Sequence, residues 1–303
     1  MIVRWGLGEL APLLSELEIE RPFLVASARW DALGLPAAAR WSEIPSHRIT
    51  VPEGADGVLA VGGGSAIDTA KAASSAASLP LVSVPTTYSG AEWTAFFGVR
   101  GPGKRMVGGG GGANLVGTVY EPELTLDLPR PETGGTAMNA LAHCVEALYP
   151  GDLEEARRGA ELIVDWLPRV LAELRDLEAR TRLLEGANLA GQALAKHGLY
   201  LGHAMAQAIG GRYGLPHGTL NAICLPAAMR FNADVAPLAL EVVPVETAEE
   251  LARLAGLTRL RDLGVPEDEL DEVAEAVAAR PGARANPRPA SAAEIAELLH
   301  AIW

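Results

Sequence analysis

The stretch Val58-Leu-Ala-Val-Gly-Gly-Gly-Ser65 decides how the first part of the chain folds. Its apolar half is typical of a buried strand, and its glycines form a turn that leads into an alanine-rich helix over residues 66–77. Residues 81–84 are another apolar run, which ends at Pro85-Thr-Thr. Strand, glycine turn, helix and strand in this order predict a parallel sheet with helices on its faces.

The pattern changes near Pro129. Before it, residues 107–112, Val-Gly-Gly-Gly-Gly-Gly, predict a mobile loop, because glycine carries much backbone entropy. After it, long helical patterns follow one another, and capping boxes at Thr247 and Ser291 open two later helices. We place the long helices at residues 136–149, 155–177, 179–197 and 199–210. The chain therefore reads as an α/β domain followed by an all-helical domain.

Composition excludes several classes of protein. The chain has 303 residues, 49% of them hydrophobic, which is enough for a sizeable core. Its formal net charge of −13 argues against non-specific nucleic-acid binding and against an anionic membrane surface. Cys144 and Cys224 lie in apolar runs and do not form a disulfide framework. The first residues lack the pattern of a signal peptide, and no apolar run is long enough for a bilayer, so we expect a cytoplasmic protein.

Histidines recur at helical spacing in the second half. His203 and Gln207 are four residues apart and share one helical face, and His217 follows a Gly/Pro turn. Asn139 and His143 form the same spacing on another apolar helix. We predict that these side chains form one polar pocket between two helices. The alternative is that each histidine is a satisfied core residue.

The glycine turn carries its own chemistry. Backbone N–H groups at Gly63, Gly64 and Ser65 can approach a pyrophosphate at the positive end of the following helix. Asp68 lies in the first turn of that helix, and Lys71 follows one turn later. A glycine-rich turn is by itself a weak signal, and this one is neither the spaced dinucleotide fingerprint nor a P-loop.

Taken together, these stretches resemble the iron-containing alcohol dehydrogenase superfamily. The matching motifs run in order along the chain: Gly62-Gly-Gly-Ser-Ala-Ile-Asp68-Thr-Ala-Lys71, Pro85-Thr-Thr, Tyr120-Glu-Pro-Glu-Leu-Thr-Leu, the stretch from His203 to His217, and Asn286-Pro-Arg-Pro289. Pro85-Thr-Thr-Tyr88 and the run from Asn139 to Tyr149 look most like the maleylacetate reductase branch.

The resemblance implies a Rossmann-like dinucleotide-binding domain over residues 1–130, an all-helical catalytic domain over residues 131–303, and NAD or NADP in the cleft between them. It implies cofactor contacts from the residues of the glycine turn and the threonine-rich stretch, with a lysine near the ribose. These are Gly63, Gly64, Ser65, Asp68, Thr86, Thr87, Tyr88 and Lys104. It also implies an Fe²⁺ or Zn²⁺ site at Asn139, His143, His203 and His217, with the three histidines catalytic, and a homodimer.

Some positions depart from the family pattern. Asn139 replaces the usual aspartate, which removes a negative charge from the metal site and leaves metal binding open. Gln207 replaces a histidine that relays protons in the alcohol dehydrogenases, and glutamine is neither acid nor base. The run Ala26-Ser-Ala-Arg29 lacks the aspartate that holds the NAD ribose, so NADP is admissible. Ala204, Gln207 and Asn221 stand where the reductase branch has basic groups, which disfavours a dianionic substrate.

We therefore expect an NAD(P)-dependent oxidoreductase that interconverts an alcohol and a carbonyl by hydride transfer on a small or bulky substrate. Three alternatives stay open: maleylacetate-type reduction of a conjugated keto acid, oxidation or oxidative decarboxylation of a hydroxyl on a peptide, and a non-catalytic dinucleotide-binding protein. The dehydroquinate synthase relatives, which share the expected fold, fit the motifs less well.

Overall fold

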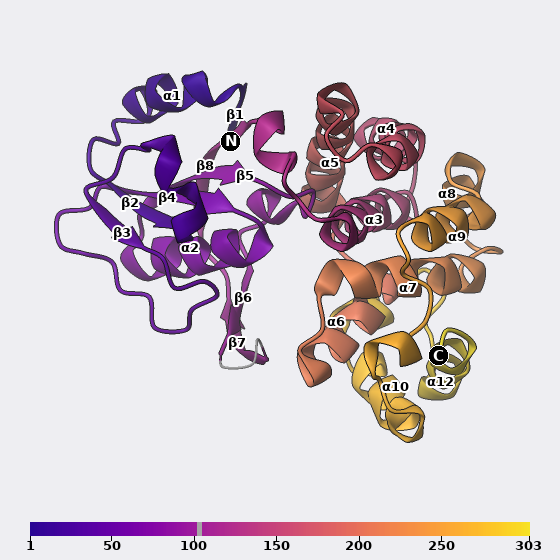
Figure 1. Ribbon diagram of the computed structural model, residues 1–303. Helices are drawn as coiled ribbons and strands as arrows, with labels where there is room; N and C mark the ends of the chain where they lie inside the picture. The colour runs from indigo at the N-terminus through magenta and orange to yellow at the C-terminus, as the bar shows by residue number, and fades with distance from the viewer. Residues whose placement is uncertain (102–104) are drawn as a thin grey trace. The chain divides into compact units, whose positions relative to one another are not determined.

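The computed structural model describes residues 1–101 and 105–303. It divides into two compact units, the α/β unit Met1–Leu126 and the helical unit Asp127–Trp303 (Figure 1). The predicted fold class, an α/β amino-terminal part with an all-helical carboxyl-terminal part, is confirmed. The predicted boundary between residues 130 and 131 lies a few residues after the division at Leu126.

The α/β unit is built on a six-stranded sheet in the order β1-β8-β5-β4-β2-β3, with all neighbouring strands parallel. Its strands are β1 (Ile2–Trp5), β2 (Pro22–Ala26), β3 (Ala39–Trp41), β4 (Gly57–Gly62), β5 (Pro80–Pro85) and β8 (Asn114–Tyr120). Strand β4 is buried along its whole length, which explains why its sequence is continuously apolar rather than alternating.

Two helices close the faces of this sheet (Figure 1). Leu59 and Val61 point to the face covered by α1 (Leu10–Glu16), where Leu13 packs against them. Val58 and Ala60 point to the opposite face, which the alanine-rich α2 (Gly64–Ala77) covers. Because successive strand residues face opposite sides, one short apolar strand supplies both cores.

Residues 107–110 of the glycine run form a strand, so the predicted mobile loop at residues 107–112 is wrong for these four residues. Strand β7 (Met106–Gly110) pairs antiparallel with β6 (Phe97–Arg100). Glycine at these positions leaves room for the large side chains of neighbouring residues. A Cβ on Gly110 would lie 2.7 Å from Cζ of Phe97. Likewise, a Cβ on Gly98 would lie 2.8 Å from Cε of Met106. The partner strand offsets the entropy that glycine loses on ordering.

The helical unit is arranged around α3 (Arg130–Ala147), whose residues from Ala137 onwards are all buried. Helices α4, α5 and α7 pack against it. The other helices are α4 (Glu154–Ala172), α5 (Leu177–His197), α6 (Leu201–Tyr213), α7 (His217–Phe231), α8 (Pro237–Val242), α9 (Val245–Leu254), α10 (Leu270–Ala278), α11 (Pro281–Arg284) and α12 (Ala292–Ala301). Among the described residues, no helix combines the length and the apolar character that a bilayer span needs.

Of the two predicted capping boxes, one is confirmed. Ser291 and Glu294 cap each other at the start of α12, with Ser291 Oγ accepting from the Glu294 amide at 3.3 Å. Thr247 does not begin a helix, because α9 already starts at Val245, directly after Pro244. A proline ahead of a helix sets a backbone angle suited to helix entry and needs no amide partner, so it displaces the expected start.

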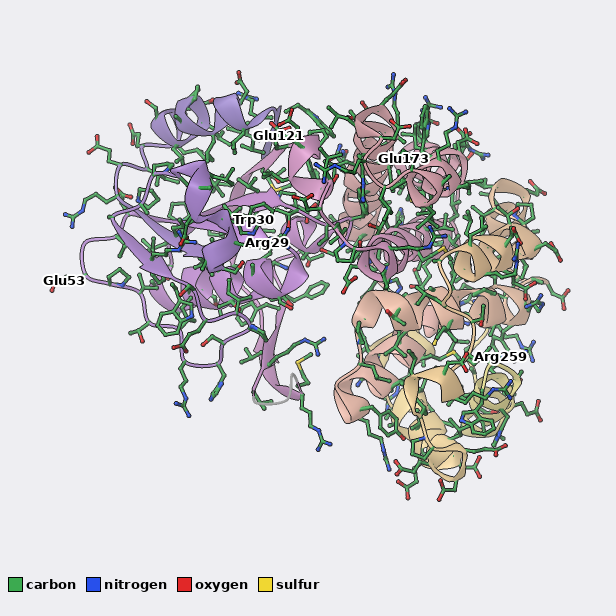
Figure 2. All side chains as sticks on the ribbon, viewed as in Figure 1. Arg29, Trp30, Glu53, Glu121, Glu173 and Arg259 are labelled. Atoms are coloured by element: carbon green, nitrogen blue, oxygen red, sulfur yellow. The ribbon has the colours of Figure 1, made fainter. Side chains whose placement is uncertain are left out.

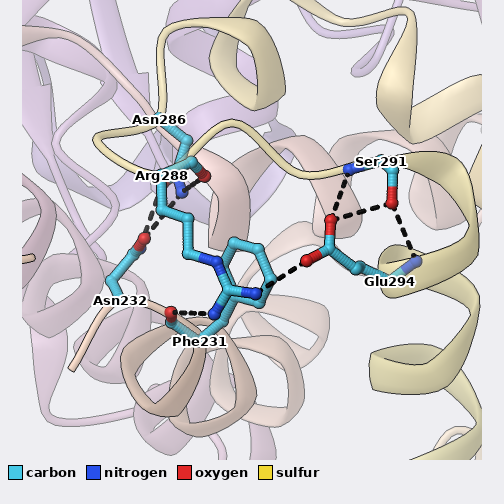
Figure 3. A network of polar contacts seen from close by, with 6 residues as sticks. All are labelled: Phe231, Asn232, Asn286, Arg288, Ser291 and Glu294. Atoms are coloured by element: carbon cyan, nitrogen blue, oxygen red, sulfur yellow. Dashed lines mark hydrogen bonds and ion pairs between the residues drawn. The ribbon is translucent and has the colours of Figure 1, made fainter. Parts of the chain in front are cut away.

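The Asn286-Pro-Arg-Pro289 motif fastens the chain before α12 to the end of α7 (Figure 3). The buried amides of Asn286 and Asn232 donate to each other's oxygens at 2.7 and 3.0 Å. Arg288 stacks its guanidinium 4.1 Å over the Phe231 ring and donates to Glu294 at 2.7 Å. The motif therefore holds the last helix in place.

Replacement of Asn286 by alanine should destabilise the protein by about 2–4 kcal/mol, because it removes the paired amide and leaves that of Asn232 buried without its partner. The free energy of unfolding in urea measures this. The matched variant Ser291→Ala, which loses only the helix cap, should cost about 1 kcal/mol. Equal effects of the two variants would contradict this reading of the motif.

Candidate functional site

Three histidines from three helices gather inside the helical unit. His143 lies on α3, His203 on α6 and His217 at the first position of α7. The rings of His143 and His203 stack with centroids 4.7 Å apart, and the centroids of His203 and His217 are 5.6 Å apart. His143 and His203 are buried, whereas His217 is half-buried. The structure thus brings the predicted residues together, and we call them the histidine cluster.

Glycines bring the helices close enough for this cluster. A Cβ on Gly218 would lie 2.6 Å from the carbonyl oxygen of Gly135, so the start of α7 rests directly on the backbone of α3. A Cβ on Gly202 would lie 3.0 Å from Oε1 of Glu146, so α6 also approaches α3 closely. Helix backbones can meet in this way only where side chains are absent.

Glu146 is the residue that sequence reasoning missed. Its fully buried carboxylate accepts hydrogen bonds from the backbone amides of Tyr200 at 2.7 Å and His203 at 3.1 Å. It also pairs with the ring Nδ1 of His203 at 2.8 Å. A carboxylate in the apolar helix that carries His143 was the available signal, because a buried acid must find partners.

The Glu146 contact orients His203. With the carboxylate accepting at Nδ1, that nitrogen carries the proton and Nε2 is left facing away from Glu146. Within the described residues, His203 Nε2 has no hydrogen-bond partner although it is buried, and the same is true of His143 Nδ1. Burial lowers the pKa of His143 well below its usual range, and the neighbouring His203 and His217 lower that pKa further. His143 is therefore neutral at pH 7.

Asn221 links two more of the predicted residues. It lies one turn after His217 on α7, and its Nδ2 donates to Oδ1 of Asn139 at 2.5 Å. The same nitrogen lies 2.9 Å from Nε2 of His217. In this orientation the NH₂ group faces both Asn139 and His217, and Asn221 Oδ1 is buried with no partner among the described residues.

These contacts bear on the metal site that the resemblance to the family implies. Two of the four expected ligand atoms, Asn139 Oδ1 and His217 Nε2, face the Asn221 amide. No set of three or more histidine, cysteine or acidic side chains among residues 1–101 and 105–303 is arranged to hold a metal ion. In this arrangement Asn139 and His217 hydrogen-bond to Asn221, while His203 Nε2 and His143 Nδ1 have no partner among the described residues, and the Fe²⁺ or Zn²⁺ site stays a prediction.

The glycine turn lies in the α/β unit, at the carboxyl ends of β4 and β5. Thr86 donates its backbone amide to the carbonyl of Gly62 at 3.1 Å, and a Cβ on Gly63 would lie 2.8 Å from Cγ2 of Thr87. Helix α2 begins at Gly64 and Ser65. Gly63 precedes it, so no side chain caps its first backbone amides. The start of α2 thus lies at the sheet edge where α/β proteins bind nucleotides.

Asp68 and Tyr88 are occupied by packing contacts. Asp68 accepts from Lys71 Nζ at 3.3 Å and from the Gly98 amide at 3.2 Å, which ties α2 to β6. Burial raises the pKa of Asp68, and the adjacent Lys71 opposes this shift. The Tyr88 ring is fully buried in the α/β unit. Lys104 lies outside the described residues. The proposed cofactor contacts of these residues stay predictions.

Arg29 and Trp30 follow β2 (Figure 2). The Arg29 guanidinium lies 4.4 Å from the centre of the Trp30 ring. The indole Nε1 would lie 4.0 Å from a Cβ on Gly62, so this pair borders the glycine turn. The nearby carboxylate of Asp31 pairs with Arg40 at 2.5 Å. The end of β2 therefore presents a cation beside the turn.

Comparison with known proteins identifies the family. Residues 133–255 match the model of the Fe-containing alcohol dehydrogenase family, C-terminal, and residues 48–110 match that of the iron-containing alcohol dehydrogenase. The chain is 37% identical over 235 residues to a maleylacetate reductase of Pseudomonas knackmussii, covering 73% of this chain and 67% of that protein. The chain belongs to the iron-containing alcohol dehydrogenase family. It is an oxidoreductase.

Further comparisons place the similarity in the maleylacetate reductase branch. Maleylacetate reductase 1 of Rhodococcus opacus is 30% identical over 289 residues, which cover 91% of this chain and 80% of that protein. The crystal structure of maleylacetate reductase from Agrobacterium tumefaciens superposes with a TM-score of 0.86 at 27% identity, covering 100% of this chain and 95% of that one. The resemblance to this family and branch is thus confirmed.

Glu146→Gln should lower kcat/KM about 10- to 100-fold, because an amide cannot accept from all three N–H groups and His203 loses its orientation. Steady-state kinetics with any carbonyl that the enzyme reduces measures this effect. Glu155→Gln is the matched control, since Glu155 pairs with Lys196 on the surface, and it should behave as wild type. Wild-type kinetics of Glu146→Gln would refute the role of Glu146.

Proposed function

We propose that this enzyme interconverts an alcohol and a carbonyl by hydride transfer, using a nicotinamide dinucleotide held at the glycine turn and the histidine cluster as the site of reaction. The observation that carries the proposal is the pair of buried ring nitrogens without a partner, His203 Nε2 and His143 Nδ1, in stacked rings. Buried polar atoms are otherwise nearly always bonded, so these two suit a substrate oxygen.

In the reductive direction, hydride passes from the nicotinamide to the carbonyl carbon while the oxygen takes a proton. His203 is suited to supply that proton from Nε2, because the Glu146 carboxylate stabilises the positive charge on the ring. His143 stays neutral and hydrogen-bonds the same oxygen. In the oxidative direction the same groups remove the proton from the alcohol.

The proposal needs no resident metal. The amide of Asn221 occupies two of the acceptors that a metal would use, and it holds His217 and Asn139 in place instead. Polarisation of the substrate oxygen then falls to the imidazoles, which matches the absence of a carboxylate at position 139.

Both NAD and NADP are candidate coenzymes for the α/β unit. We propose that the enzyme accepts NADP. No carboxylate follows β2 directly, where Ser27 and Ala28 stand, and Arg29 lies beside the glycine turn. A cation at this position favours a 2′-phosphate over a free ribose hydroxyl. Cytoplasmic location and a homodimer stay predictions.

A second candidate reaction is the reduction of maleylacetate, favoured by the identity with maleylacetate reductases. Oxidation of NADH or NADPH on addition of maleylacetate separates it from reduction of simple carbonyls. Oxidation of a peptide hydroxyl would appear as turnover of bulky alcohols only. Tight coenzyme binding with no turnover would indicate a non-catalytic protein.

His203→Ala should reduce kcat by about 10²- to 10⁴-fold, because the substrate oxygen loses its proton donor. Single-turnover reduction of a carbonyl substrate measures the chemical step without product release. His300→Ala on α12 is the control, since that histidine is exposed and should not affect turnover. Unchanged turnover of His203→Ala would disprove the assignment.

Arg29→Asp should shift the ratio of kcat/KM for NADPH over NADH by about 10- to 100-fold toward NADH, because a charged hydrogen bond to the phosphate is lost and a carboxylate is gained. Arg21→Asp provides the control, since Arg21 precedes the same strand at its opposite end. If both variants shift the ratio equally, general electrostatics and not Arg29 sets the preference.

A further inference from the structure

Arg280 lies directly before α11 and extends its side chain to α6, the helix that carries His203. Its Nη1 donates to the Gln207 side-chain oxygen and its Nη2 to the Gln207 carbonyl, both at 3.3 Å. Its Nε is buried and has no partner among the described residues. Two long bonds to neutral acceptors leave most of the capacity of this guanidinium unused.

No carboxylate in residues 1–101 and 105–303 forms an ion pair with Arg280. Arg212, also on α6, differs, because it pairs with Glu269 and Glu272 at 2.6 and 2.7 Å. Burial accordingly lowers the pKa of Arg280, with no acidic neighbour to offset the shift. A half-buried guanidinium without a counter-charge is costly unless an anion visits it.

The backbone holds Arg280 at this place. A Cβ on Gly282 would lie 2.9 Å from the carbonyl oxygen of Tyr200 and 3.0 Å from that of Leu199, so the turn after Arg280 rests on the chain that enters α6. A Cβ on Gly211 would lie 3.9 Å from Nη2, so the guanidinium runs beside the next turn of α6 as well. This position is built into the packing of α6 against the segment that leads into α11.

Arg280 is connected to the histidine cluster through Gln207 on α6. Gln207 follows His203 by four residues and shares its helical face. Gln207 is half-buried, so it lies outside the closed core of the helical unit. Four residues at about 1.5 Å each separate the backbone of His203 from that of Gln207, which Arg280 contacts, by about 6 Å along α6.

We propose that Arg280 is a specificity-determining residue that binds a carboxylate of the substrate, so that the enzyme prefers keto acids and hydroxy acids over neutral carbonyls and alcohols. This inference rests on the proposed reaction at His203. A 4-oxo acid carries its carboxylate three bonds from the carbonyl carbon, so it is short enough to lie along the distance of about one helical turn between Gln207 and His203. The guanidinium binds such a group through two parallel N–H···O bonds. A single basic residue also suits one carboxylate rather than two.

The experiment compares two ketones of equal length, 4-oxopentanoate and 2-pentanone, with NADPH and NADH. The wild type should reduce 4-oxopentanoate with kcat/KM about 10- to 100-fold above 2-pentanone, mainly through KM. Arg280→Gln should abolish this preference and leave the kcat/KM for 2-pentanone within about twofold. Arg280→Lys, which keeps the charge without the fork, should restore part of it. The control Arg284→Gln removes an exposed arginine from α11 and should keep the wild-type preference.

The proposal is overturned if the wild type shows no preference for the acid, or if Arg280→Gln lowers both substrates equally. Calorimetric titration with pentanoate, which cannot be reduced, separates this failure from failure of the proposed reaction. If no ketone turns over, weaker pentanoate binding by Arg280→Gln than by Arg284→Gln still supports the anion site. Equal pentanoate affinity of both variants, or no binding to the wild type, rejects it.

Discussion

The packing of α6 against α3 in the helical unit depends on the buried carboxylate of Glu146. This carboxylate receives three N–H groups from the start of α6. Because the amides of Tyr200 and His203 are otherwise unpaired helix-start donors, the carboxylate acts as their cap from another helix. The same oxygens set the proton on His203 at Nδ1. Fold and chemistry thus share one group, and its loss affects both.

Neutral amide side chains, rather than charged groups, form several of the buried hydrogen bonds of the helical unit. Asn221 bridges Asn139 and His217, and the pair of Asn232 with Asn286 closes the far end of α7. Each amide supplies both donors and an acceptor, so it satisfies buried neighbours without adding charge to a protected interior. The charge in this region lies on Glu146 and, at the half-buried edge, on Arg280.

Several features could be predicted from the sequence because local rules govern them. The continuous apolar run of β4, the glycine turn after it and the capping box at Ser291 depend on residues close in the chain. The spacing of Asn139 with His143 and of His203 with Gln207 likewise places each pair on one helical face. The gathering of the histidines was predicted from these spacings, the turn before His217 and the resemblance to the family, and the structure brings the three rings together.

The features that escaped prediction depend on partners far apart in the chain. The glycines of β7 form a strand because β6 supplies the hydrogen bonds and Phe97 and Met106 fill the space. Glu146 and Asn221 acquire their roles only when α6 and α7 meet α3. Arg280 gains a place beside α6 through the packing of Gly282, which no spacing rule reveals.

The most direct test of the account is nitrogen-15 NMR of the histidine rings in the labelled protein, before and after dialysis against a chelator. The account predicts a His203 ring protonated at Nδ1, a slowly exchanging Nδ1 proton, a neutral His143, and signals that the chelator leaves unchanged. A His203 ring unprotonated at Nδ1, or ring signals that shift on chelation and return with Zn²⁺, would contradict it.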